Sequence, residues 1–142
     1  MGACNRLILF DSGPLYANVD SNDQHHDRAE TLFQTYSGLA IVPVLVTPEV
    51  AHLLQSRLGR HAEERFLRDL TRRELLIEQI DPFDWDRIVE LVEQYHDLPL
   101  GTVDASIIAA AERLNISTIA TFDRRHFTVV RPAHIDAIEL VL

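Results

Sequence analysis

The chain has 142 residues, of which 46% are hydrophobic, and a formal net charge of -9. This length suits one domain with one substantial core, so we expect a single domain over residues 1–142. The acidic charge argues against a generic nucleic-acid coat protein, which would bind phosphates through a basic surface. A single cysteine, Cys4, excludes a disulfide framework and suits a reducing cytoplasm, and we expect neither a membrane segment nor an export signal.

Basic residues are concentrated in one part of the chain. All 13 are arginines, which bind phosphate in a bidentate manner. Residues 57–73 contain six arginines and three acids, a local charge of +3, whereas residues 81–97 have a local charge of -5. The chain can therefore attract an anionic ligand locally despite its total charge.

The N-terminal half alternates between apolar runs and amphipathic segments. An apolar run over residues 7–10 ends at Asp11, and Gly13 and Pro14 then predict a turn. Helical spacing predicts a helix over 27–36, and a second apolar run predicts a strand over 40–46. The helix that follows is expected to be capped by Thr47 and to carry Glu49 in its first turn. Its predicted apolar stripe is Val50, Leu53, Leu54 and Leu58.

The alternation continues to the end of the chain. After Gly59 we expect a helix with one apolar and one basic face, a strand over 75–80, and an acidic helix over 82–95 that packs Phe83 and Trp85. Thr102 is expected to cap a helix over 103–114 that ends at Asn115 in the left-handed conformation. Further strands are expected over 118–122, 129–130 and 138–142. This order predicts an α/β fold with a mainly parallel sheet covered on both faces, where ligands bind at the carboxyl ends of the strands.

Four acids are candidates for a metal site at that edge of the sheet. Asp11 and Asp123 each follow a strand-like run, so a parallel sheet would place them together. Asp104 lies in line with the buried stripe of its helix, where no basic residue shares the stripe, and an unpaired buried charge favours a bound cation. Glu49 adds a carboxylate from another first helical turn. Each acid alone also has a simpler interpretation, as a turn former or a helix cap.

Carboxylate oxygens suit hard divalent cations, and four acids can hold one or two ions. Such an ion activates water and stabilises charge on phosphate oxygens, so the pattern indicates phosphodiester hydrolysis.

Four segments of the chain resemble the PIN-domain ribonucleases. They are LILFDSG (7–13), TPEVAHL (47–53), VDASIIAAAERL (103–114) and TIATFDRRHF (118–127). Within that family the chain is similar to the VapC-type toxins of bacterial type II toxin–antitoxin systems. The resemblance implies a PIN-like (Rossmann-like) three-layer α/β/α sandwich with about five strands, RNA cleavage with Mg²⁺ or Mn²⁺, and a cognate VapB-type antitoxin. By position it implies metal-site and catalytic roles for Asp11, Glu49, Asp104 and Asp123, with Ser12 and Thr121 as polar support.

One segment departs from the family pattern. Many relatives carry a further acid before the aromatic residue that follows the last metal-site Asp, whereas this chain has Arg124, Arg125 and His126 before Phe127. This departure argues against a second ion, and we expect Arg124 and Arg125 to contact RNA phosphate instead. We also expect a homodimer, from the resemblance and because half-buried helices leave an apolar patch.

Other functions fit the sequence less well. A phosphoacceptor receiver domain requires a lysine, and the chain contains none. A haloacid-dehalogenase phosphatase requires a second Asp where this chain has Gly13. A metal site at His25 and His26 and a nucleophilic role for Ser12 are both disfavoured. A catalytically degenerate PIN-like binding module remains the alternative, and the arginine stripe Arg65, Arg68 and Arg72 could face RNA, antitoxin or water.

Overall fold

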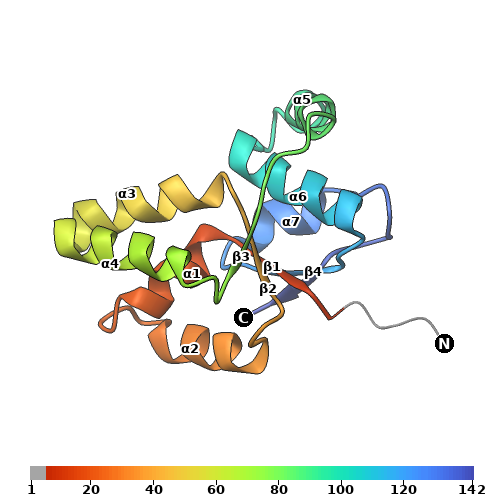
Figure 1. Cartoon of the computed structure of the whole chain (residues 1–142). Helices are drawn as coiled ribbons and strands as arrows, with labels where there is room; N and C mark the ends of the chain where they lie inside the picture. The colour runs from red at the N-terminus through yellow and green to blue at the C-terminus, as the bar shows by residue number, and fades with distance from the viewer. Residues whose placement is uncertain (1–5) are drawn as a thin grey trace.

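The computed structural model describes residues 6–142, so Cys4 lies outside the described part of the chain. Within it the chain forms five strands and seven helices (Figure 1). The strands are β1 (Ile8–Phe10), β2 (Ala40–Pro43), β3 (Leu76–Glu78), β4 (Thr118–Ala120) and β5 (Glu139–Val141). The helices are α1 (Ser12–Val19), α2 (His26–Thr35), α3 (Val46–Leu58), α4 (Arg60–Thr71), α5 (Asp84–Gln94), α6 (Thr102–Leu114) and α7 (Arg124–Val129). Among residues 6–142, none of the helices combines the length and the apolarity that a membrane crossing requires.

The strands form one sheet in the order β3-β2-β1-β4-β5, and every pairing is parallel. The chain runs outward from β1 to β2 and β3 and then crosses to β4 and β5 on the other side of β1. In such sheets ligands bind where the direction of winding changes. In the view of Figure 1, α6 and α7 lie above the strands and α2 lies below them. The predicted α/β fold with helices on both faces of a parallel sheet is confirmed.

Burial on both faces of the sheet explains why the three inner strands have continuous apolar sequences. Every residue of β1, β2 and β4 is buried, whereas the edge strands β3 and β5 are partly exposed. A strand covered on both faces needs apolar side chains in both directions. Fully burying an aliphatic side chain stabilises the fold by roughly 1.5–3 kcal/mol, so these strands anchor the edge of the sheet where the acids lie.

Residues 12–19 form helix α1 where the sequence predicted a turn, so that prediction was wrong. The Asp11 carboxylate accepts a hydrogen bond from the Ser12 backbone N–H at 2.8 Å, at the start of the helix. Pro14 lies in the first turn, where a helix does not use the missing N–H. Gly13 and Pro14 are therefore compatible with a helix start directly after a strand.

Two predicted side-chain caps were also wrong. Helix α3 begins two residues earlier than predicted, at Val46, and the Thr47 hydroxyl donates to the Val44 carbonyl at 2.7 Å. Helix α6 includes Thr102, and its cap position is Gly101, without a side-chain cap bond. The expected terminator Asn115 is confirmed, with φ 55° and ψ 46°.

Three apolar side chains that were expected to pack are exposed. Leu58 is 43% exposed, Phe83 is 80% exposed and Trp85 is 47% exposed. Phe83 precedes the first turn of α5, outside the periodicity that buries the apolar face of that helix. The predicted strand over 129–130 was wrong because α7 continues to Val129, whereas the strand predicted over 138–142 is confirmed as β5.

Candidate metal centre

Four carboxylates lie around one cleft at the carboxyl ends of the central strands. The cleft has a volume of about 430 Å³. Its lining residues are Asp11, Ser12, Gly13, Glu49, Gly101, Thr102, Val103, Asp104, Phe122 and Asp123. The structure thus brings together the four acids that the sequence singles out, from positions more than a hundred residues apart in the chain.

Asp11 is held by the pairing of β1 with β4. Phe10 is in register with Ala120, so Asp11 and Thr121 are the next residues on adjacent strands. The Thr121 hydroxyl donates to Asp11 Oδ2 at 2.8 Å, while Oδ1 accepts from the Ser12 backbone. Both carboxylate oxygens therefore have fixed donors, which orients the group before any ligand binds.

The Asp11 carboxylate is a poor place for an uncompensated charge. It is 7% exposed, and burial raises its pKa from 3.8 to about 6. The hydrogen bonds from Thr121 and Ser12 oppose this rise in pKa, and the nearby charges of Asp104 and Glu49 add to it. A cation bound beside Asp11 would remove the main reason for the raised pKa.

Glu49 lies in the first turn of α3, as predicted. Its Oε1 atom accepts a hydrogen bond from the Ser12 hydroxyl at 2.5 Å. Ser12 therefore supports both carboxylates, Asp11 through its backbone and Glu49 through its side chain. This is the hydrogen-bonding role that the sequence favoured over a nucleophilic one.

Asp104 differs from the prediction in one respect, because it has a basic partner. His126 Nδ1 lies 2.8 Å from Asp104 Oδ2, with side chains that are 19% and 18% exposed. Burial raises the pKa of Asp104, His126 opposes that rise, and the charges of Asp123 and Glu49 add to it. The stripe of α6 alone could not reveal this partner, because His126 reaches Asp104 from α7.

Asp123 caps α7 and shares the same histidine. Its side chain accepts from the His126 backbone N–H at 3.4 Å, and its own N–H donates to the Thr121 hydroxyl at 2.9 Å. His126 Nδ1 lies 3.0 Å from Asp123 Oδ2. One nitrogen and two carboxylate oxygens, from His126, Asp104 and Asp123, thus lie within 4.8 Å of one another. His126 was not predicted to have a role at the site, although its position three residues after Asp123 places both on one helical turn.

The two arginines after Asp123 are exposed at the start of α7. The Arg124 guanidinium donates to the Leu142 carbonyl at 3.3 Å, so its position is partly fixed by the end of the chain. Arg65 and Arg68 are exposed on α4, which lies beside α3 (Figure 1).

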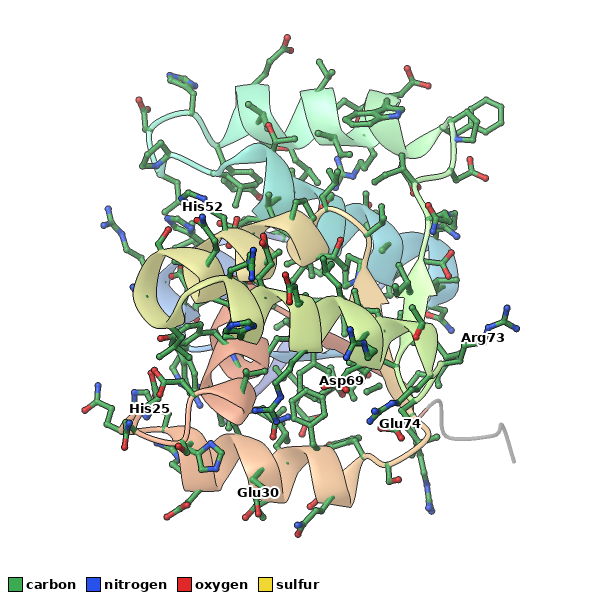
Figure 2. All side chains as sticks on the ribbon, turned by 60° about the vertical axis from the view of Figure 1, so that its left-hand side comes forward. His25, Glu30, His52, Asp69, Arg73 and Glu74 are labelled. Atoms are coloured by element: carbon green, nitrogen blue, oxygen red, sulfur yellow. The ribbon has the colours of Figure 1, made fainter. Side chains whose placement is uncertain are left out.

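The neighbouring histidines His25 and His26 face different partners. His25, labelled in Figure 2 before α2, stacks on Phe122 with ring centroids 4.3 Å apart. His26 Nε2 pairs with Glu30 at 3.1 Å. Neither contact resembles a metal site. His25 instead packs against Phe122, which forms an aromatic wall of the cleft.

Comparison with known proteins gives one family. The family model "PIN domain" matches residues 8–131. A curated relative, ribonuclease VapC26 of Mycobacterium tuberculosis, is 27% identical over 125 residues, which cover 88% of this chain and 93% of that protein.

Solved structures share the fold. The crystal structure of Mycobacterium tuberculosis VapC20, described as a sarcin-ricin loop cleaving toxin, superimposes with a TM-score of 0.78 at 19% identity, over 84% of this chain and 92% of that one. A toxin–antitoxin complex from Klebsiella pneumoniae gives a TM-score of 0.68 at 21% identity, over 95% and 96% of the two chains. These likenesses support the fold.

Proposed function

The chain belongs to the PIN domain family, and from this membership we propose that it is a metal-dependent endoribonuclease, the toxin of a VapBC-type toxin–antitoxin pair. We propose further that residues 1–142 form a single PIN domain. The observation that carries the proposal is the convergence of Asp11, Glu49, Asp104 and Asp123 on one cleft. The ribonuclease relative supports the reaction class, because it aligns with most of this chain.

The donor set of the cleft fits a divalent cation. Four carboxylates line it, and none of its described lining residues is an arginine. The raised pKa values of Asp11 and Asp104 show that their charges are not fully compensated by the protein alone. Oxygen ligands of this kind suit Mg²⁺ or Mn²⁺, and the four acids would hold the ion.

The chain's own residues prepare this site. Thr121 and the Ser12 backbone fix the Asp11 carboxylate, and the Ser12 hydroxyl fixes Glu49. Asp104 is positioned in the first turn of α6, and Asp123 is positioned as the cap residue of α7. A divalent ion bound among these acids would activate a water molecule and screen the charge that develops on the phosphate oxygens. Because the ligands are held in place beforehand, little ordering is left to be done when the ion binds.

The RNA backbone needs positive charge close to the cleft, and we propose that Arg124 and Arg125 provide it. Both are exposed and follow directly on Asp123, which lines the cleft. Their guanidinium groups can bind phosphate in a bidentate manner. With a net charge of -9, the chain depends on such local contacts for its affinity.

We propose two protein partners. The similarity to one chain of a toxin–antitoxin complex supports a cognate VapB-type antitoxin. A homodimer would cover some of the exposed apolar side chains, among which Phe83, Trp85 and Val89 occur within or beside α5.

The test is cleavage of RNA by the purified, metal-free chain after addition of Mg²⁺ or Mn²⁺. We expect cleavage that requires the ion and is lost in Asp104→Asn, whereas Asp97→Asn, whose side chain is 96% exposed, should cleave like the parent. Metal binding without cleavage of any RNA would favour the alternative, a catalytically degenerate PIN-like binding module. Equal cleavage by Asp104→Asn and the parent would contradict the proposed site.

A further inference from the structure

We propose that His126 is a nitrogen ligand of the metal ion, so that the subsite formed by Asp104, Asp123 and His126 binds a divalent transition-metal ion such as Mn²⁺ in preference to Mg²⁺. The inference rests on the proposed function only in assuming that the cleft binds a divalent ion. The missing acid before Phe127 was expected to argue against a second ion, and His126 occupies that position in the chain.

The spacing of the three side chains is that of ligands in one coordination shell. His126 Nδ1 lies 2.8 Å from Asp104 Oδ2 and 3.0 Å from Asp123 Oδ2. Neighbouring ligands of an octahedral ion with bonds of about 2.1 Å lie about 3 Å apart. An ion can therefore enter among these atoms with small side-chain movements, because the two nitrogen–oxygen distances already match and all three atoms lie within 4.8 Å of one another.

The backbone around His126 fixes the ring in this position. Asp123 accepts a hydrogen bond from the His126 backbone N–H, which joins the two residues within the first turn of α7. The next residue, Phe127, is 1% exposed and anchors the helix in the core. Thr121 accepts from the Asp123 backbone N–H, which ties the turn to the end of β4. The His126 side chain itself is only 19% exposed, and it contacts Asp104 and Asp123, which line the cleft.

The chemistry of the ligands determines the preferred ion. Mg²⁺ takes oxygen ligands and gives up its waters reluctantly, whereas imidazole nitrogen is a common ligand of transition-metal ions. A carboxylate at position 126 would serve both kinds of ion, but a histidine adds affinity mainly for the second kind. His126 thus gives this chain a selectivity that its four carboxylates would not provide.

A second interpretation assigns His126 to pairing alone. Its ring could remain hydrogen-bonded to Asp104 and Asp123 while the ion binds nearer to Asp11 and Glu49. The two interpretations differ in whether the nitrogen contacts the ion, and this difference is directly measurable.

The experiment uses Mn²⁺ as the probe and the full chain without RNA. Electron spin echo measurements on bound Mn²⁺ detect a coordinated ¹⁴N nucleus, and competition with Mg²⁺ gives the ratio of the two affinities. The variants are His126→Gln, which removes the nitrogen ligand, and His126→Asp, which substitutes a carboxylate. The matched control is His61→Gln, because the His61 side chain is 84% exposed on α4.

We expect ¹⁴N coupling in the parent and in His61→Gln, and none in His126→Gln or His126→Asp. The preference for Mn²⁺ over Mg²⁺ should fall at least about tenfold in both His126 variants. Mn²⁺ that binds the parent without ¹⁴N coupling, an unchanged preference in His126→Gln, or no binding of Mn²⁺ at all would overturn the inference. Failure of the proposed function has a different signature, in which the parent binds Mn²⁺ with ¹⁴N coupling but cleaves no RNA.

Discussion

The Thr121 hydroxyl donates a hydrogen bond to Asp11 Oδ2 at 2.8 Å, although the two residues are 110 positions apart in the chain. The same hydroxyl oxygen accepts from the Asp123 backbone N–H. One small side chain therefore orients the Asp11 carboxylate and fixes the backbone of Asp123, and it does so because β1 and β4 are adjacent parallel strands.

Thr121→Val should weaken metal binding and destabilise the fold. Valine keeps the shape but leaves the Asp123 N–H without its acceptor and Asp11 Oδ2 without its donor, at a cost of roughly 1–3 kcal/mol. Mn²⁺ titration and urea unfolding would measure both effects. Thr118→Val is the control, since Thr118 lies at the other end of β4 and its hydroxyl bond to Glu139 is 3.5 Å long. Equal Mn²⁺ affinity in Thr121→Val and Thr118→Val would contradict the positioning role.

Asp11→Asn should abolish RNA cleavage and stabilise the metal-free protein above pH 6. The pKa of Asp11 is about 6 in the folded protein against 3.8 for the free group, so ionisation costs folding stability as the pH rises through this interval. The shift corresponds to at most about 3 kcal/mol, of which the variant would recover a part. Urea unfolding in the presence of a chelator at pH 5 and pH 8 would measure it. A variant less stable than the parent at pH 8 would refute the charge-crowding argument, and Asp97→Asn is the exposed control.

Gly13→Ala should disturb the aromatic wall of the cleft. A Cβ atom at position 13 would lie 2.7 Å from Phe122 Cδ2, so the ring must move and its stacking on His25 would change. Overpacking of this kind costs roughly 1–3 kcal/mol, which the better helix propensity of alanine offsets only in part. Gly101→Ala adds a methyl group to the same cleft with nothing within 4 Å of it. Thermal unfolding should show a larger loss for Gly13→Ala, and equal losses would mean that Phe122 adapts freely.

Replacement of Arg124 and Arg125 by alanine should weaken RNA binding and leave Mn²⁺ binding intact. With few local cationic contacts, we expect a shallow salt dependence that corresponds to about two to four neutralised phosphates. The double variant should reduce this slope, as measured by RNA binding between low and moderate salt. Arg65→Ala with Arg68→Ala on α4 is the comparison, and a larger effect there would move the RNA contact to the arginine stripe of that helix.

Local sequence patterns predicted the parts of the site that depend on single elements. Asp11 directly follows a buried strand and Glu49 lies in a first helical turn, and both features are visible in an apolar run or an apolar stripe. The parallel sheet followed from the alternation of strands and helices, and it was enough to place Asp11 and Asp123 at one edge. Asp11 and Asp123 could be placed together from the sequence because this placement required only the order of strands and helices along the chain.

The predictions that failed concern contacts between different helices and strands, or residues whose effect depends on their position within a helix. Helix α1 was read as a turn because Gly13 and Pro14 are both breakers in a helix interior, whereas only their place in the first turn decides the outcome. His126 was overlooked as a partner of Asp104 because the contact joins α6 to α7, and no periodicity within either helix reports it. Phe83 was expected to be buried by the helix predicted over 82–95, but α5 begins only at Asp84 and Phe83 is 80% exposed.

The spread of the cleft along the chain has a consequence during translation. Its acids begin at Asp11 and end at Asp123, and the histidine beside them is residue 126. A ribosome that synthesises this chain from its N-terminus therefore releases no complete site until the segment through β4 and α7 has emerged and paired with β1. Incomplete chains that stop before β4 contain three of the four carboxylates but lack both Asp123 and His126. The cleft is thus complete only in chains that are nearly finished.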